Sequence, residues 1–332
     1  MLLSRGQIET LADPGEVMAN LRNGFIATAN GDGSSNSHGR RADSGGGVGI
    51  RPLRVRTDLP GPGTATALLP GLLAGVPAYT VKVNAKFPGA TPALRGVVCL
   101  HDLRDGQLLA LLDSATVTAL RTGFAAALAT DRLARPGGTL AVIGAGAQAR
   151  LVVRGLARLR SLSRITVYDL DPAKAETFAA EHRSLLDVQL DVVPKLENAL
   201  ARAGIVVLST WSRAPLVKAA DLRAGLHVTS LGADEPGKIE LSAEALLAGR
   251  VVVDDIPLAL AMGAIGNVGL TAEAIHATIG QVLSGECVGR ADDEQVTLYA
   301  PVGLPWQDLA VAWPVYRASL DSESLRRFDF QA

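Results

Sequence analysis

The sequence lacks net charge, paired cysteines and long apolar runs, and each absence excludes a class of protein. With 32 basic and 33 acidic residues the net charge is −1, so no basic field favours nucleic acid or an anionic membrane. The two cysteines, Cys99 and Cys287, lie far apart without a CxxC pair, which predicts small buried side chains in a reducing cytosol.

No uninterrupted apolar stretch of about 18 residues is present, so no transmembrane helix is expected. The opening Met1-Leu2-Leu3-Ser4-Arg5 turns polar too soon for a signal peptide, and a cytoplasmic location is predicted. What the chain does have is 332 residues, 48% of them hydrophobic and 20% charged, which is typical of a soluble protein with two domains.

The first third of the chain predicts one helix followed by short strands. The helix is expected over 15–29, and the stretch 30–49 that follows is rich in glycine, serine and asparagine. A long helix, with Ser114 as its candidate N-cap, is expected over 114–134. Apolar segments separated by proline and glycine indicate strands between these helices, at 50–57, 78–84, 96–102 and 107–112.

Beyond Pro136-Gly137-Gly138, apolar strands alternate with helices. The strands are expected at 139–143, 165–169, 188–193, 205–209, 227–231 and 251–254. Near-continuous apolar strands joined by helices are what a parallel sheet covered on both faces requires. The sequence therefore predicts an α/β fold with a doubly wound parallel sheet, and a tail helix at 306–317 that fits either domain.

A glycine-rich turn marks the candidate cofactor site. Gly144-Ala145-Gly146-Ala147-Gln148-Ala149 follows the first of these strands and opens a helix. Gly144 makes the tight turn, Gly146 lets the backbone approach a pyrophosphate, and the small Ala149 allows close packing of helix on strand. The N–H groups at the helix N-terminus, around Ala147 and Gln148, are placed to bind the phosphates.

The next strand ends at Asp169, which lies 23 residues beyond Gly146. An acid there suits the ribose 2′-hydroxyl of NAD and would repel the 2′-phosphate of NADP. Arg164 precedes the strand, on the wrong side to receive that phosphate, so the predicted cofactor is NAD. Asp171 is an alternative ribose contact, or it forms an Asx turn with Pro172.

Several motifs, taken in order, resemble the ornithine cyclodeaminase/mu-crystallin family over nearly the whole chain. They are Arg51-Pro52-Leu53-Arg54, Lys82, Leu120-Arg121-Thr122-Gly123, Leu133-Ala134-Arg135, Gly144–Ala149, Gly232–Leu241, Val252–Asp255 and Gly303–Ala310. The resemblance implies a Rossmann domain at 126–302 and a smaller α+β domain built from 1–125 and 303–332. The smaller domain would bind the substrate, an amino acid or imine, and form a homodimer.

The resemblance assigns Arg54 and Arg121 to the substrate carboxylate, which a guanidinium binds through paired hydrogen bonds. Arg54 lies 28 residues before Lys82, as the family pattern has it, and Arg56 is the alternative. Lys82 stands in an apolar strand and is expected to exchange protons with the substrate or to bind its carboxylate. The plain alternative is an edge-strand lysine that blunts aggregation, and Lys86 is interpreted as a loop charge.

Asp234 follows the fifth of the predicted parallel strands and matches the family's general acid or base. An Asx turn or helix cap near Pro236-Gly237 is the structural alternative. The other implied cofactor contacts are Thr210 toward the nicotinamide, Lys238, Leu231, Arg121 and Thr122, while Val302 would line the substrate pocket. None of the five histidines stands in a ligand pair, so no metal site is predicted.

Three departures from the family pattern leave the substrate open. Phe87–Pro92 has no asparagine, Leu69-Pro70 replaces Met-Pro, and Ala300–Gly303 lacks a serine. The leading hypothesis is an NAD-dependent cyclodeaminase that converts ornithine or a related diamino acid to proline or a homologue with loss of ammonia. The alternatives are a ketimine reductase or amino-acid dehydrogenase using NAD(P)H, and a non-catalytic protein that retains NAD.

Overall fold

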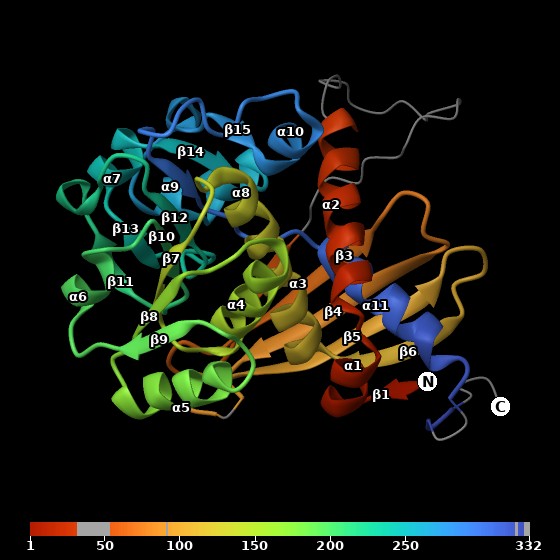
Figure 1. The fold of residues 1–332 in the computed structure, drawn as a ribbon. Coiled ribbons are helices and arrows are strands. Elements are labelled where there is room, and N and C mark those ends of the chain that lie inside the picture. Colours follow the sequence, from red (N-terminus) through yellow and green to blue (C-terminus); the bar gives the residue numbers. More distant parts are fainter. Residues whose placement is uncertain (32–53, 91, 323–324, 329–332) are drawn as a thin grey trace. The chain divides into compact units, whose positions relative to one another are not determined.

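The computed structural model describes residues 1–31, 54–90, 92–322 and 325–328, and the chain forms two compact units (Figure 1). Unit 1 comprises Met1–Thr122 and Leu304–Ala332, and unit 2 comprises Gly123–Gly303. Helix α3 (Ser114–Leu133) runs from one unit into the other. The glycine-rich stretch 30–49 and the Arg51-Pro52-Leu53 part of the first motif lie outside the described residues.

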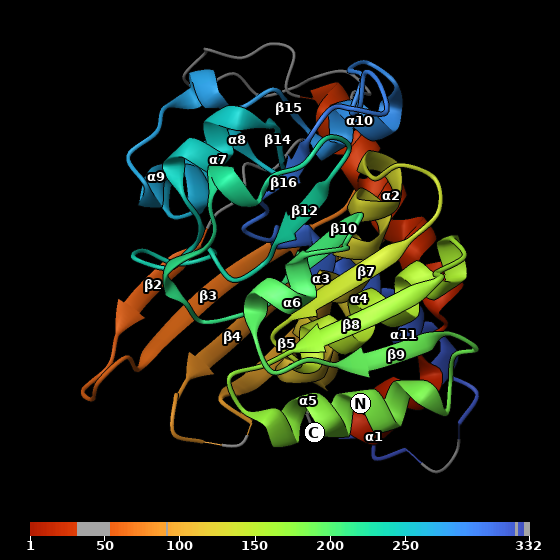
Figure 2. The same ribbon diagram turned by 60° about the vertical axis from the view of Figure 1, so that its left-hand side comes forward.

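Unit 1 is a six-stranded sheet with helices packed on one face (Figure 2). The strand order is β1 (Leu2–Leu3), β6 (Leu108–Asp113), β5 (Leu94–Asp102), β4 (Ala78–Lys86), β3 (Ala65–Leu72) and β2 (Val55–Asp58), antiparallel except for β1 with β6. Helix α11 (Trp306–Ser319) contacts β3, β4, β5 and β6 as well as α2 (Pro14–Gly31), and α1 (Arg5–Leu11) contacts α11 and β6. The alternating burial along β3 and β4 follows, because successive side chains of a strand point to opposite faces.

Unit 2 contains an eight-stranded sheet whose strands are all parallel. Its order is β15 (Ala277–Thr278), β14 (Arg250–Val253), β16 (Thr297–Tyr299), β12 (His227–Ser230), β10 (Ile205–Leu208), β7 (Thr139–Ile143), β8 (Arg164–Tyr168) and β9 (Gln189–Val192). Neighbouring residues of one strand enter different apolar clusters, as Val142 and Ile143 do, so both faces are buried. The expected doubly wound α/β fold is confirmed.

Helices and a small second sheet complete unit 2. The small sheet pairs β11 (Arg213–Val217) with β13 (Ile239–Leu241). The helices are α4 (Ala147–Leu159), α5 (Pro172–Arg183), α6 (Leu196–Leu200), α7 (Ala243–Ala248), α8 (Ile256–Ala261), α9 (Ala264–Asn267) and α10 (Ile279–Ser284), with 3-10 turns at Ala219–Asp221 and Ala272–Ala274.

Three local expectations were wrong. Lys86, interpreted as a loop charge, is the last residue of strand β4 and pairs with Ala65 and Leu94. Asp113, not Ser114, caps α3, because its carboxylate accepts hydrogen bonds from the N–H and hydroxyl of Thr116, whereas the Ser114 hydroxyl donates to Asn84. Cys99 and Cys287 are free thiols but only partly buried. Within the described part of the chain, no helix is both long and apolar enough to cross a bilayer.

Candidate functional site

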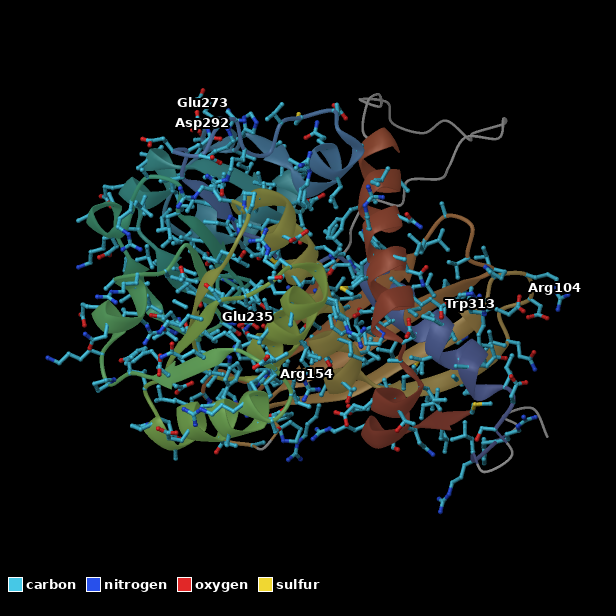
Figure 3. The ribbon with its side chains drawn as sticks, viewed as in Figure 1. Arg104, Arg154, Glu235, Glu273, Asp292 and Trp313 are labelled. Carbon is cyan, nitrogen blue, oxygen red and sulfur yellow. The ribbon has the colours of Figure 1, made fainter. Side chains whose placement is uncertain are left out.

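A lysine is buried inside unit 1, beside an aspartate. Charged side chains such as Arg104, Glu273 and Asp292 extend outward from the ribbon (Figure 3), but only 1% of Lys82 is exposed. Its Nζ lies 2.8 and 3.0 Å from the two carboxylate oxygens of Asp308. The alternation of β4 explains the burial, because Lys82 shares the helix-covered face with its cross-strand partners Leu69 and Val98.

The charges around Lys82 perturb its proton affinity. Burial lowers the pKa of Lys82 from 10.5 to about 8, Asp308 opposes that fall, and the positive charges of Arg121 and Arg54 add to it. Near neutral pH the ammonium therefore dominates, and a measurable fraction is the free amine. A buried lysine with this proton affinity can give or take a proton near neutral pH.

Arg121 also lies beside Asp308, and the residues around Lys82 form a charged cluster in unit 1. Part of the Arg121 guanidinium is fixed by contacts with α11. Its Nη1 donates to Oε1 of Gln307 at 3.0 Å, and its Nε lies 3.6 Å from Asp308. That Nε and the hydroxyl of Thr122 are buried without a hydrogen-bond partner among the described residues. Unsatisfied buried donors are costly unless a ligand accepts them, so both are places where a ligand would bind.

The two candidate arginines that precede β3 differ in their surroundings. Arg54 is half-buried and close enough for its charge to act on Lys82. Arg56 pairs with Asp58 at 2.6 Å on the exposed strand β2. Only Arg54 therefore joins the cluster.

The glycine-rich turn of unit 2 has the local form that a pyrophosphate needs. Gly144 has φ +92°, and a Cβ there would meet the Ser209 carbonyl, so only glycine fits. Gly146 is the N-cap of α4 without a side-chain capping bond, and a Cβ on it would point into open space. The first N–H groups of α4, at Ala147 and Gln148, therefore lie at a helix start with no side-chain cap, which is where an anion can bind.

Asp169 lies directly after β8 and is tied to that turn. Its Oδ2 accepts from the N–H of Ala145 at 2.8 Å and its Oδ1 from Asp171 at 2.9 Å. Asp171 caps α5 through Ala173, which supports its interpretation as an Asx turn. The Arg164 guanidinium forms an ion pair with Asp191, with 2.7 Å between Nη2 and Oδ2.

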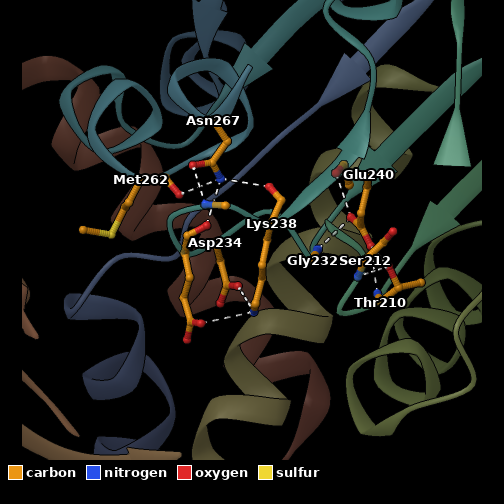
Figure 4. Close-up of polar contacts among 11 residues, drawn as sticks. Thr210, Ser212, Gly232, Asp234, Lys238, Glu240, Met262 and Asn267 are labelled. Atoms are coloured by element: carbon orange, nitrogen blue, oxygen red, sulfur yellow. Dashed lines mark hydrogen bonds and ion pairs between the residues drawn. The ribbon is translucent and has the colours of Figure 1, made fainter. Parts of the chain in front are cut away.

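A fully buried glutamate joins the carboxyl ends of β10 and β12 (Figure 4). Oε1 of Glu240 accepts from the N–H and the hydroxyl of Thr210, and Oε2 accepts from the hydroxyl of Ser230 and the N–H of Gly232. Burial raises the pKa of Glu240, although these four hydrogen bonds act in the opposite direction. The Thr210 hydroxyl, expected to face the nicotinamide, thus donates a hydrogen bond to Glu240 and accepts one from the N–H of Ser212.

Replacing Glu240 by glutamine should destabilise unit 2. In either orientation the new amide NH₂ faces a backbone N–H, of Thr210 or of Gly232, that loses its acceptor. We expect the free energy of unfolding to fall by about 1–3 kcal/mol, measured by chemical denaturation. Glu244→Gln on the exposed start of α7 is the matched control and should change it little; equal stabilities for the two variants would contradict the bonding described.

Asp234 lies in the loop that follows β12, and its carboxylate is paired. Lys238, nine-tenths buried, places its Nζ 2.6 Å from Asp234 and 3.7 Å from Glu235 (Figure 4). Burial disfavours the ammonium, but the two carboxylates outweigh it and raise the pKa of Lys238. Asn267 fixes the same loop, since its Nδ2 donates to the carbonyls of Glu235 and Lys238.

The remaining predicted contacts are Leu231 and Val302. Leu231 is buried in the core, and its N–H donates to Leu208, so only its carbonyl is left for a cofactor. The N–H groups of Val302 and Gly303 donate to Asp254 at 3.0 and 2.6 Å. Burial raises the pKa of Asp254 to about 6 despite these two bonds.

Sequence reasoning assigned no role to five residues that build these sites. They are Asp254, Glu240, Asn267, Gln307 and Asp308. The available signal was a polar pair, Gln307-Asp308, at the start of a helix that is apolar from Leu309 to Val315. Among the described residues no group of three metal-binding side chains occurs, and His227 is bonded to Thr297 and Thr229.

A family model for the ornithine cyclodeaminase/mu-crystallin family matches residues 55–323. The chain belongs to this family. Two relatives are the alanine dehydrogenase of Archaeoglobus fulgidus, 36% identical over 69% of this chain and 72% of its own, and the L-lysine cyclodeaminase of Streptomyces rapamycinicus, 38% identical over 61% and 64%. The relatives in the family are thus enzymes of more than one reaction type.

Two solved structures of the family share the whole fold. An archaeal alanine dehydrogenase dimer with bound NAD superposes with a TM-score of 0.87, 29% identity and coverage of 99% of both chains. The Δ1-pyrroline-2-carboxylate reductase of Thermococcus litoralis, in complex with NADH and L-proline, gives 0.86 and 28% over 96% of this chain and 97% of that one.

Proposed function

We propose that this chain transfers hydride between NAD(H) and the α-carbon of a small amino acid or its imine, acting as an imine reductase or amino-acid dehydrogenase. The observation that carries the proposal is the buried cluster of unit 1. There, the positive charges of Arg54 and Arg121 act on Lys82, and Lys82 and Arg121 share the carboxylate of Asp308. A buried excess of positive charge is costly unless an anion joins it, and the α-carboxylate of the substrate is such an anion.

Within that cluster the residues divide the work. Arg121 has guanidinium N–H groups left beyond its contacts with Gln307 and Asp308, and these can grip a carboxylate. Arg54 is the second anchor. Lys82 holds the proton that the imine nitrogen gains on reduction, or takes it up on oxidation.

Unit 2 supplies the features for the dinucleotide. The open space around a Cβ at Gly146, the uncapped start of α4 and the acid at Asp169 fit NAD, and Arg164 is engaged by Asp191. Bound NADH would supply the hydride. The residues that we propose contact NADH are Gly144, Ala147, Gln148, Thr210, Leu231, Lys238 and, from unit 1, Thr122.

Cyclodeamination of a diamino acid is the second candidate. Asp234, directly after β12, is the carboxylate proposed to take a proton from the distal amine, and the similarity to a lysine cyclodeaminase supports this reading. Lys238 already pairs with Asp234 at 2.6 Å, however, so a distal ammonium would compete with it. Solved structures of a dehydrogenase, a reductase and a lysine cyclodeaminase each cover at least 96% of this chain, so it is the Lys238 pairing that favours the first candidate.

Assays with the two substrate classes separate the candidates. With NADH and Δ1-pyrroline-2-carboxylate, or a small α-keto acid with ammonia, we expect net loss of NADH and formation of the amino acid. With NAD⁺ and ornithine or lysine, a cyclodeaminase would yield ammonia and a cyclic amino acid with no net NADH. Activity in the second assay alone would overturn the first candidate, and activity in neither would overturn both.

The outer face of the unit 1 sheet supports a homodimer. Val55, Leu68, Val83 and Val97 are direct cross-strand neighbours on β2 to β5, and each is 39–47% exposed. The adjacent row, Pro70, Val81, Cys99 and Leu111, is also apolar and partly exposed. A contiguous apolar sheet face of this kind marks an interface, and we propose that a second copy of the chain covers it, since a similar structure is a dimer.

A charge in this row should separate the protomers. Val83→Glu replaces an exposed side chain, so the fold should be retained, but each protomer would then present a carboxylate to the apolar row of its partner. We expect the mass measured by light scattering to fall from that of a dimer to that of a monomer. Leu170→Glu, at a 91% exposed position of unit 2, is the control and should stay dimeric. A dimeric Val83→Glu variant or a monomeric wild type would contradict the assignment.

A further inference from the structure

The first turn of α11 places the carboxylate of Asp308 beside Lys82 and Arg121, a position that substrate binding alone does not require. Asp308 has no exposed surface, and its oxygens lie 2.8 and 3.0 Å from Nζ of Lys82 and 3.6 Å from Nε of Arg121. A negative charge beside Arg121, the proposed anchor of the substrate carboxylate, weakens the attraction for that substrate. A role other than anion binding therefore has to explain its position.

We propose that Asp308 is a positioning residue, which holds the side chains of Lys82 and Arg121 in place and keeps Lys82 in its ammonium form until the substrate needs the proton. The inference rests on the function proposed above, since it names the group that prepares Lys82 for that reaction.

The geometry around Nζ supports this role. Lys82 has two polar partners in the described part of the chain, Asp308 from α11 and the Thr118 hydroxyl from α3 at 3.3 Å. The other charges acting on it, Arg121 from α3 and Arg54 ahead of β2, are both positive and repel the ammonium. Among the described residues, Asp308 is thus the charge near Lys82 that favours protonation, and neutralising it leaves the buried Lys82 and Arg121 without the carboxylate that they share.

The same carboxylate also fixes orientation. Gln307 and Asp308 are neighbours on α11, and both contact the guanidinium of Arg121. Gln307 accepts in addition from the N–H of Leu304, which anchors the start of the helix. One helical turn thus sets the positions of the proposed carboxylate anchor and of the proposed proton donor together.

Direct titration of Lys82 tests the proposal without any turnover. The chain has six lysines, so NMR of protein labelled at the lysine side chains resolves few signals, and the signal lost in Lys82→Met identifies Lys82. In the wild type its midpoint should lie at about 8. In Asp308→Asn we expect it to move at least about one unit lower, because the opposite charge is gone. An unchanged midpoint would overturn the proposal.

Two further variants separate charge from position. Thr118→Val removes the neutral partner of Nζ and should shift the midpoint far less than Asp308→Asn. Asp308→Glu keeps the charge but moves it, so the midpoint should stay near that of the wild type while kcat falls and KM changes less. Should Asp308→Asn not fold, Asp308→Glu decides: full activity would exclude a positioning role.

Turnover provides the second readout. In the reductive direction, the fall of kcat/KM with rising pH should move at least about one unit lower in Asp308→Asn. If the wild type turns over no imine or amino acid, the proposed function fails, and the NMR titration still decides the role of Asp308. If turnover is present and its pH profile does not move, the role of Asp308 fails alone.

Discussion

Lys82→Met should lower kcat/KM for imine reduction by about 10²–10⁴-fold, the usual contribution of a positioned proton donor. Methionine has a similar length and fills the same space, but it carries no proton for the imine nitrogen. The NADH affinity, which we attribute to residues of unit 2 and to Thr122, should change little. The measurement is steady-state kinetics with NADH and Δ1-pyrroline-2-carboxylate, beside NADH binding by fluorescence.

The pH dependence follows from the protonation state that each direction needs. Reduction needs the ammonium of Lys82, so its kcat/KM should fall as the pH rises through about 8. Oxidation of the amino acid needs the free amine, so its kcat/KM should rise through the same pH. Both limbs should be missing in Lys82→Met and present in Lys86→Met, on the same strand. A wild type without an inflection near that pH would exclude Lys82 as the group that exchanges the proton.

Gly146→Val should abolish NADH binding while leaving the protein folded. A Cβ at this position meets no atom within 4 Å, and the backbone, with φ −82° and ψ −175°, is one that valine adopts readily. The side chain would instead fill the space through which a pyrophosphate approaches the backbone. We expect the Kd for NADH to rise at least about 100-fold, or about 2.7 kcal/mol.

Two comparisons make the Gly146 result specific. Gly89→Val in unit 1, where a Cβ also meets nothing, should leave NADH binding unchanged. Gly144→Ala should lower the melting temperature as well, because of the positive φ and the Ser209 carbonyl. Tight NADH binding by a folded Gly146→Val variant would place the pyrophosphate elsewhere.

The sequence predicts the fold best where a single strand or helix has a clear hydrophobic pattern within its own residues. β7 and β12 are apolar runs flanked by turns, and each begins at the expected residue. β3 was missed because Pro70 and Gly71 interrupt it, yet a Cβ at Gly71 would meet the Pro305 carbonyl, so glycine is needed there. β16 has only three residues, too few for a periodicity to be recognised.

The same contrast, between local patterns and contacts made only in the folded chain, applies to the candidate site. Lys82 and Arg121 stand out from the sequence, because each is a charge in an apolar segment. Asp308 does not stand out, because its importance depends on a contact with Lys82. That residue is 226 positions away, so only the folded chain makes the contact. Glu240 is a similar case, as its four bonds join the ends of two strands that are separate in the sequence.

Transfer of deuterium from NADH labelled at its reactive carbon tests hydride transfer to an amino-acid α-carbon most directly. With Δ1-pyrroline-2-carboxylate, or a small α-keto acid with ammonia, we expect one deuterium at Cα of the product for each NADH consumed, read by mass spectrometry and NMR. Lys82→Met and Gly146→Val should both lose this transfer. Retention of all the label in NADH, by a protein shown to bind NADH, would contradict the proposed reaction.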